Sequence, residues 1–191
     1  MQVFNPKKYT DTLRQHYETY FGKTGKQLRL EYGPQEKLHS DFYVLEIVPN
    51  DRHSMFCYCT VGMSADRLDE NLIELVLYSP RPDNSIVELL TFCASYHRNK
   101  LPLNIHHTVN IGQPWLDNSK CDHGFISLLY LDGENLELFN FGGQIIHCYW
   151  FIPITEKERD FKMDNGCEAL ELLFEENQFD YLDPNRESLA P

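Results

Sequence analysis

The first regular pattern along the chain is a set of apolar residues at helical spacing. Between residues 9 and 21 the apolar positions recur every three or four residues, which is typical of one buried helix face. Asn5 can cap this helix, Pro6 suits its first position, and Gly22 can end it. We therefore predict a helix between Pro6 and Gly22, followed by a polar connector to Ser40. The expected apolar face consists of Tyr9, Leu13, Tyr17, Tyr20 and Phe21.

Three runs rich in β-branched and aromatic residues follow the connector. They are Asp41–Val48, Met55–Val61 and Asn71–Tyr78, and residues typical of turns separate them. Because consecutive strands with short connections usually pair, we predict an antiparallel three-stranded meander. Pro80 and Pro82 then close this unit, since neither residue can donate to a sheet.

A second helix and a long irregular segment occupy the middle of the chain. Ser85 and Glu88 have the spacing of a capping box, which predicts a helix from there to about Asn99. The stretch Lys100–Gly124 has no clear period, and it is therefore a candidate binding loop. The expected apolar side of the helix carries Ile86, Leu89, Leu90, Cys93, Ala94 and His97.

The pattern after residue 124 predicts three strands joined by two tight turns. Phe125–Leu131 and Glu134–Phe141 are expected to form a hairpin around Asp132-Gly133, a pair that favours a type I′ turn. Gly142-Gly143 then turns the chain into a last strand, Gln144–Ile152. The proline that follows is expected to stop this strand.

An acidic helix is predicted after that strand. Thr155 and Glu158 form a second capping-box pair at its start. Asn165-Gly166 is expected to break it into two helices, because both residues disfavour a helix interior. The expected apolar face carries Phe161, Met163, Cys167, Leu170, Leu173 and Phe174.

These elements predict an α+β fold. Two runs of strands separated by a helix, with helices at both ends, indicate a mainly antiparallel, mixed-order sheet flanked by helices. The chain has 191 residues, which suits one compact unit. We expect residues 1–40 to supply an N-terminal helix and connector that pack with a larger domain formed by residues 41–191.

Charge narrows the range of partners. The chain has 17 basic and 29 acidic side chains, so its formal net charge is −12. That balance argues against a nucleic-acid partner, because phosphate binding needs clustered Lys and Arg. Residues 155–191 are the most acidic stretch, with 4 basic against 11 acidic residues. Such a surface either steers a cationic partner or only keeps the protein soluble.

The sequence gives no sign of a membrane segment. The N-terminus lacks the apolar run of a secretory signal. The longest uncharged run, residues 138–155, contains glycine, asparagine, glutamine, histidine and proline, so it suits strands better than a bilayer span. We therefore expect a cytoplasmic protein with no membrane partner.

The cysteine and histidine residues do not have the spacing of a metal site. Cys57 and Cys59 form a Cys-x-Cys pair on a predicted strand, where both side chains face the same side of the sheet. Zinc sites usually need two chelating pairs on turns, so we predict no metal and no other cofactor. Without a secretory signal, all six cysteines are expected to be reduced, and most of them buried.

One short motif could support catalysis. Cys121-Asp122-His123 lies in the predicted irregular segment, where a thiol near a histidine could act as a nucleophile. Members of a catalytic triad rarely come from adjacent residues, however, and no phosphate-binding loop or nucleophile elbow accompanies them. We therefore predict that the protein is not an enzyme.

The remaining candidates are residues that could bind a protein. Trp115 lies in the long irregular segment, and tryptophan is a favoured interface anchor. Carboxylates near it and on the C-terminal helix could meet a basic partner. The predicted protein-binding residues are Trp115, Asp117, Asp122, Glu168, Glu171, Glu175 and Glu176.

Several short segments, taken in order, resemble a known family. They are Gly62-Met63-Ser64, Glu74-Leu75-Val76-Leu77, Leu89-Leu90, Pro153-Ile154-Thr155-Glu156-Lys157-Glu158-Arg159, Gly166 with Leu170, and Asp183-Pro184-Asn185-Arg186-Glu187-Ser188. Over residues 41–188 the chain is similar to the Suppressor of fused domain family in its short bacterial form. The resemblance implies an α+β protein-binding domain without catalytic residues.

The family also implies possible partners. Its animal member clamps a transcription-factor peptide, partly by adding it as a strand, and its bacterial members are regarded as immunity proteins against polymorphic toxins. This chain lacks the second half of the animal protein, so the two-lobed clamp does not carry over. Our first hypothesis is an immunity protein that binds a basic toxin domain. The alternatives are a regulatory adaptor that binds a cellular peptide by strand addition, and a metal- or cysteine-dependent enzyme built on Cys121, His123 and His106.

Overall fold

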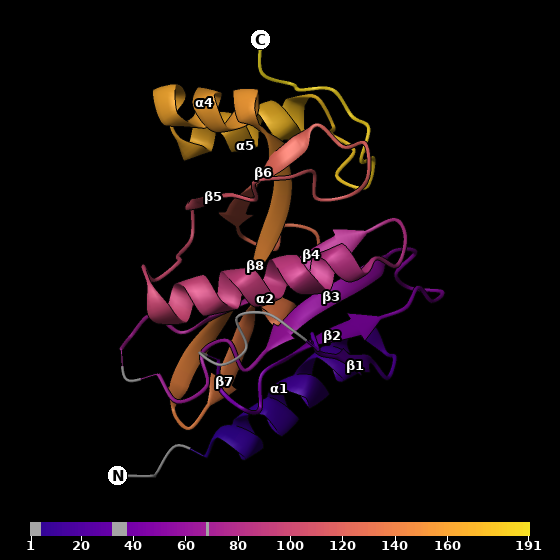
Figure 1. Cartoon of the computed structure of the whole chain (residues 1–191). Helices are drawn as coiled ribbons and strands as arrows, with labels where there is room; N and C mark the ends of the chain where they lie inside the picture. Colours follow the sequence, from indigo (N-terminus) through magenta and orange to yellow (C-terminus); the bar gives the residue numbers. More distant parts are fainter. Residues whose placement is uncertain (1–4, 32–37, 68) are drawn as a thin grey trace.

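The computed structural model describes residues 5–31, 38–67 and 69–191, which form one sheet with helices around it (Figure 1). The strands are β1 (Lys26–Leu28), β2 (Tyr43–Ile47), β3 (Phe56–Val61), β4 (Ile73–Ser79), β5 (Thr108–Asn110), β6 (Cys121–Ser127), β7 (Leu138–Phe141) and β8 (Gln144–Thr155). The helices are α1 (Pro6–Phe21), α2 (Asn84–Asn99), α3 (Glu134–Glu137), α4 (Glu156–Asn165) and α5 (Cys167–Glu176). Part of the predicted connector, residues 32–37, lies outside the described residues.

The sheet combines an antiparallel meander with one parallel pairing. Its order is β1-β2-β3-β4-β8-β6-β5, and β7 pairs with β8 outside this path. Strands β2, β3 and β4 are the three predicted strands, and they pair antiparallel as expected. Strands β4 and β8 are parallel, with Leu75 opposite Tyr149. The prediction of a mainly antiparallel α+β fold is therefore confirmed.

Helix α1 covers one face of the sheet, and its ends are those that the sequence predicts. The Asn5 side chain accepts a 3.0 Å hydrogen bond from the Lys8 N–H, and Gly22 ends the helix at a φ of 64°. The buried side of α1 packs into a core formed by alternate residues of β2, β3 and β8. This buried side consists of Tyr9, Thr10, Leu13, Tyr17 and Phe21.

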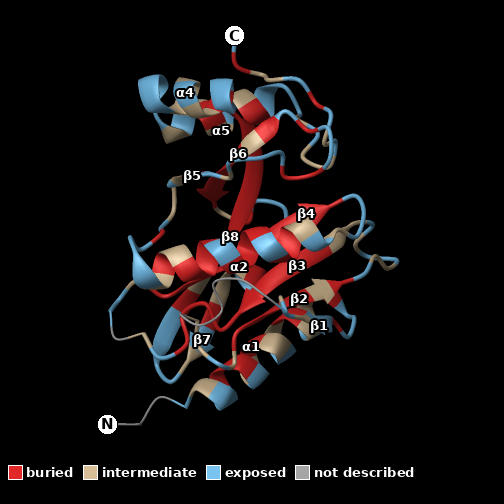
Figure 2. Cartoon of the chain, viewed as in Figure 1, coloured by how far each residue is buried: buried red, intermediate tan, exposed pale blue. Residues whose placement is uncertain are grey.

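Helix α2 covers the opposite face of the sheet (Figures 1 and 2). Leu75 and Leu77 of β4 pack with α2, whereas the alternate residues Val76 and Tyr78 belong to the α1 core. The helix begins two residues earlier than predicted. Its N-cap is Asp83, whose carboxylate accepts a 2.9 Å hydrogen bond from the Ser85 N–H. The predicted capping box at Ser85 is therefore wrong, because Asp83 already satisfies this donor.

Strand β8 runs through the centre of the sheet and is buried on both faces. Its neighbouring residues Tyr149 and Trp150 point to opposite faces, and both are buried because α2 covers one face and the α1 core the other. The strand continues through Pro153 to Thr155, so the prediction that this proline ends it is wrong. The pairing of β8 with β4 ends at Trp150, before Pro153, and the Pro153 carbonyl accepts a hydrogen bond from Arg186. Proline has no backbone N–H, so it fits a position at which β8 does not have to donate a hydrogen bond to β4.

The predicted hairpin around Asp132-Gly133 is absent from the described residues. Strand β6 pairs with β8 and not with β7, and α3 follows Gly133 directly. The reason is that the Asp132 side chain does not point into solvent at this turn. Its carboxylate accepts hydrogen bonds from the hydroxyls of Tyr20 and Tyr78, which hold it against the core. The second predicted turn, Gly142-Gly143, is confirmed, and it joins β7 to β8 with φ values of 61° and 84°.

A buried carboxylate joins α1 to the sheet. Glu74 of β4 is 0% exposed. The hydroxyls of Tyr9 and Thr60 each donate a 2.6 Å hydrogen bond to it, and the N–H groups of the turn Gly62–Ser64 donate at 3.1 to 3.2 Å. Burial raises the pKa of Glu74 to about 7, and these donors partly offset the effect. The turn after β3 is therefore built around this side chain.

Helices α4 and α5 lie together at one end of the sheet, next to the C-terminal segment (Figure 1). The predicted capping box is present. The Thr155 hydroxyl accepts from the Glu158 N–H at 3.2 Å, and the Glu158 carboxylate accepts from the Thr155 N–H at 2.8 Å. Gly166, with a φ of 95°, separates the two helices as predicted. Met163, which was expected on the apolar face, is exposed instead. No helix in the described part of the chain combines the length and apolar character needed to cross a bilayer.

Candidate partner-binding groove

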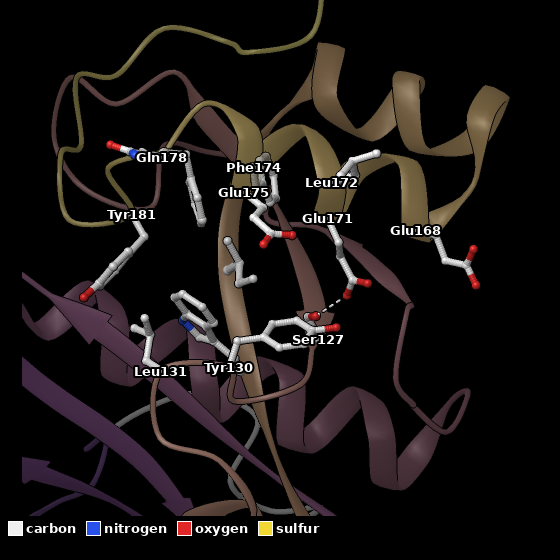
Figure 3. Close-up of a pocket in the computed structure, with 13 residues that line it drawn as sticks. Ser127, Tyr130, Leu131, Glu168, Glu171, Leu172, Phe174, Glu175, Gln178 and Tyr181 are labelled. Carbon is white, nitrogen blue, oxygen red and sulfur yellow. Dashed lines mark hydrogen bonds between the residues drawn. The ribbon is translucent and has the colours of Figure 1, made fainter.

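A groove opens between α5, β8 and the segment that follows α5 (Figure 3). Its volume is about 550 Å³. Buried side chains form its floor, among them Trp150 and Ile152 of β8. Apolar side chains at its edge are unusually accessible. Tyr130 is 60% exposed, Leu131 is 51% exposed and Leu172 is 52% exposed. Exposed apolar side chains that cluster in this way are typical of a binding surface.

Aromatic rings form one wall of the groove. Trp150 and Tyr181 meet edge to face with ring centroids 5.2 Å apart. Phe174 of α5 stacks on Phe179 with centroids 4.3 Å apart. Because β8, α5 and the C-terminal segment each contribute rings, the wall depends on all three elements.

Carboxylates form the opposite rim. Glu168, Glu171 and Glu175 of α5 all line the groove, because residues three and four positions apart share one face of a helix. Figure 3 shows Glu171 directed toward Ser127 beside Tyr130, Glu175 nearer to Phe174, and Glu168 farther out. Glu171 accepts a hydrogen bond from the Ser127 hydroxyl. Among the described residues, no hydrogen bond or ion pair is assigned to the carboxylates of Glu168 and Glu175, so both charges face solvent.

A buried ion pair holds the C-terminal segment in place. Arg186 donates to both oxygens of Glu158, at 2.6 and 2.9 Å, and to the Pro153 carbonyl at 3.0 Å. The Leu189 N–H also donates to Glu158 at 3.0 Å. Burial alone opposes ionisation, but Arg186 and the backbone donors together lower the pKa of Glu158 below its ordinary value. Because Glu158 belongs to α4, this ion pair attaches the C-terminal segment, which carries part of the aromatic wall, to α4.

The structure brings together only some of the predicted protein-binding residues. Glu168, Glu171 and Glu175 line the groove, whereas Glu176 is exposed outside it. Trp115 is 2% exposed and packs in the α2 core, so its ring is not offered to a partner. Its irregular segment folds back on α2, where the Trp115 carbonyl accepts from the Ser85 hydroxyl at 3.2 Å.

The two predicted aspartates lie outside the groove. Asp117 is exposed, and Asp122 lines a separate, more polar cavity with Lys120 and Lys157. The rings that form the groove are not among the predicted protein-binding residues. Phe179 and Tyr181 follow the acidic helix in an irregular segment, where no periodicity marks them.

The structure also locates the candidate catalytic motif. Cys121 and His123 lie in β6, not in a loop, with a register shift between them. The Cys121 thiol is buried, and burial raises its pKa, which disfavours the reactive thiolate. Within residues 5–31, 38–67 and 69–191, no three His, Cys, Asp or Glu side chains gather as a metal-binding group. All six cysteines lie in this part of the chain as free thiols, and only Cys167 is not fully buried.

The chain is similar to known proteins in both sequence and fold. A profile of the Suppressor of fused protein (SUFU) family matches residues 39–187. Comparison with curated protein sequences gave no match. Among solved structures, the crystal structure of a SUFU homologue from Neisseria gonorrhoeae has 29% sequence identity and a TM-score of 0.85. This similarity covers 97% of this chain and 98% of that one.

Two further structures share the fold at lower identity. A structure of the Sufu–Fu complex has 12% identity and a TM-score of 0.70, over 95% of this chain and 92% of that one. Drosophila Suppressor of Fused has 15% identity and a TM-score of 0.67, over 93% of this chain and 50% of that one. This chain therefore spans about half of the Drosophila protein. The family profile covers most of the sequence and the Neisseria fold covers nearly all of it, so this chain belongs to the Suppressor of fused protein family.

Proposed function

We propose that this chain is a non-catalytic protein-binding domain that acts as an immunity protein and neutralises a toxin by direct contact. The groove carries the proposal, because it combines exposed apolar side chains with carboxylates that face solvent. The family supports a binding role, since one relative of the same fold was solved as a Sufu–Fu complex. The proposed contact residues are Glu168, Glu171 and Glu175 together with the apolar edge of the groove.

Electrostatics favours a basic toxin domain as the partner. The net charge of −12 attracts a cationic protein over distances beyond direct contact. The C-terminal stretch that forms the groove is also the most acidic part of the chain. A toxin inhibitor has to associate quickly, and opposite charges raise the association rate more than they raise the affinity.

An adaptor that binds a cellular peptide is the second candidate. The sheet ends in two short strands, β1 and β5, and an outer strand can accept an added strand through its backbone groups. Genome context separates the two functions, because an adaptor needs no toxin gene beside its own.

Co-expression with the product of an adjacent toxin-like gene tests the proposal. We expect restored growth of the toxin-producing cells and a complex of the two purified proteins. Replacement of Glu171, Glu175 and Glu176 by lysine should slow association at low salt, because it reverses the charge near the groove. The absence of both protection and a complex at micromolar concentration would contradict the immunity function.

A further inference from the structure

The groove places two different demands on whatever fills it. Its aromatic wall and apolar edge favour a side chain with apolar surface. At the same time, any partner that covers the groove removes water from Glu171 and Glu175 on the rim. A carboxylate that loses its water without gaining a positive partner is costly, so a purely apolar occupant leaves the second demand unmet.

A long basic side chain meets both demands. The methylene stem of arginine or lysine packs on apolar surface while the charged end stays polar. The guanidinium or ammonium group can also lie over an aromatic ring and pair with a carboxylate. With Tyr130 exposed at the edge and Glu171 and Glu175 on the rim, the groove offers both kinds of contact (Figure 3).

Two rings of the aromatic wall, Phe174 and Phe179, already contact a guanidinium group of this chain. The Arg186 guanidinium lies 5.6 Å from the Phe179 ring centroid and 5.9 Å from that of Phe174. Its charge is balanced by Glu158, so it does not neutralise Glu175. The nearest ring nitrogen to Glu171 is that of His106, 3.9 Å away. The volume of about 550 Å³ is within the range of roughly 300–1,000 Å³ that is typical of small-ligand pockets, so a single long side chain fits.

We propose that the groove receives an arginine or lysine side chain of the protein partner, with its stem on the aromatic wall and its charge beside Glu171 and Glu175. The inference rests on the proposed function only in taking the occupant to belong to a protein. It specifies the recognition chemistry, which the immunity function alone does not.

The first test uses small probes, so it does not need the natural partner. Nα-acetyl-arginine methylamide is titrated into the full chain, and NMR follows the Trp150 indole N–H. The neutral citrulline analogue has nearly the same shape and serves as the control. We expect the arginine probe to bind about tenfold more tightly, the factor that about 1.4 kcal/mol of charge pairing supplies. Equal binding of the two probes would overturn the proposal.

Two adjacent glutamates provide matched variants. Glu175→Lys reverses a charge inside the groove, and Glu176→Lys makes the same change one residue away, outside it. Only Glu175→Lys should remove saturable binding of the arginine probe. If both variants weaken binding equally, the effect comes from net charge and the groove is not the site.

The two proposals fail in different ways. If the arginine probe binds as expected and no toxin is neutralised, the recognition chemistry stands without the immunity function. If a toxin is neutralised equally well by the Glu175→Lys and Glu176→Lys proteins, the immunity function stands and the groove proposal is wrong.

Discussion

The hydroxyl of Tyr9 donates a 2.6 Å hydrogen bond to the buried carboxylate of Glu74 and so joins α1 to β4. Tyr9→Phe should lower the free energy of unfolding by about 2 kcal/mol, since a buried carboxylate loses a donor. Tyr17→Phe is the matched control. Tyr17 is equally buried on α1, but its hydroxyl donates only to the Cys148 thiol, at 3.2 Å. Urea unfolding of both variants checks the difference, and equal losses would contradict this role of Glu74.

The same carboxylate predicts a pH dependence. Burial raises the pKa of Glu74 from 4.5 to about 7, so the folded protein binds this proton more tightly than the unfolded chain does. The stabilising contribution is complete below about pH 4.5 and is lost as the pH rises through 7. Tyr9→Phe should therefore cost more stability at pH 8 than at pH 5.5, because the missing donor served the ionised form. Urea unfolding at the two pH values measures this, and a loss independent of pH would refute it.

His97 predicts a pH dependence of the opposite sign. Burial lowers its pKa from 6.5 to about 4, and the Leu103 N–H donates to its Nδ1 at 2.8 Å, which requires the neutral ring. Its stabilising contribution is present above about pH 6.5 and is lost as the pH falls through 4. An NMR titration should show the His97 ring neutral at pH 5.5, and a midpoint near 6.5 would be inconsistent with this environment.

The ion pair between Arg186 and Glu158 should control the shape of the groove without lining it. Arg186→Met leaves Glu158 buried without its partner, which typically costs about 3–5 kcal/mol. The double variant Arg186→Met/Glu158→Met should recover much of that loss, because no unpaired charge remains. A double-mutant cycle measured by urea unfolding gives the coupling energy. Additive losses would mean that the two residues act separately.

Gly124 allows β6 and β8 to pack closely. A Cβ atom at this position would lie 1.9 Å from a ring carbon of Phe151, so Gly124→Ala requires this ring to move. We expect a loss of about 1–3 kcal/mol, the usual cost of overpacking a core. Gly124→Ala/Phe151→Leu should recover part of it, since leucine is smaller. Thermal unfolding of the two proteins measures the recovery, and no recovery would locate the strain elsewhere.

Local patterns predicted the elements that carry their own signals. The N-terminal helix, the meander strands, the Thr155–Glu158 capping box and the break at Gly166 all depend on residues close together in sequence. Three of the predicted glutamates line the groove for the same reason, since helical spacing places them on one face.

Contacts between distant segments could not be predicted in this way. Asp132-Gly133 has the composition of a hairpin turn, but the hydroxyls of Tyr20 and Tyr78 hold Asp132 in another arrangement. Trp115 sits in an irregular segment and is nonetheless buried against α2. The aromatic wall of the groove combines Trp150 with Tyr181, which only the tertiary fold brings together.

The parallel pairing of β4 with β8 has a kinetic consequence. Leu75 and Tyr149 face each other in register, although α2, β5, β6 and β7 all lie between them in the chain. Closing such a long loop is entropically slow, and folds rich in distant pairings fold slowly for this reason. Strands β1 to β4 can form early from neighbouring segments. The groove forms only after β8 has joined the sheet, because Trp150 and Ile152 of β8 line it. During that interval the apolar faces of β4 and β8 are open to other chains, so aggregation competes with folding at this step.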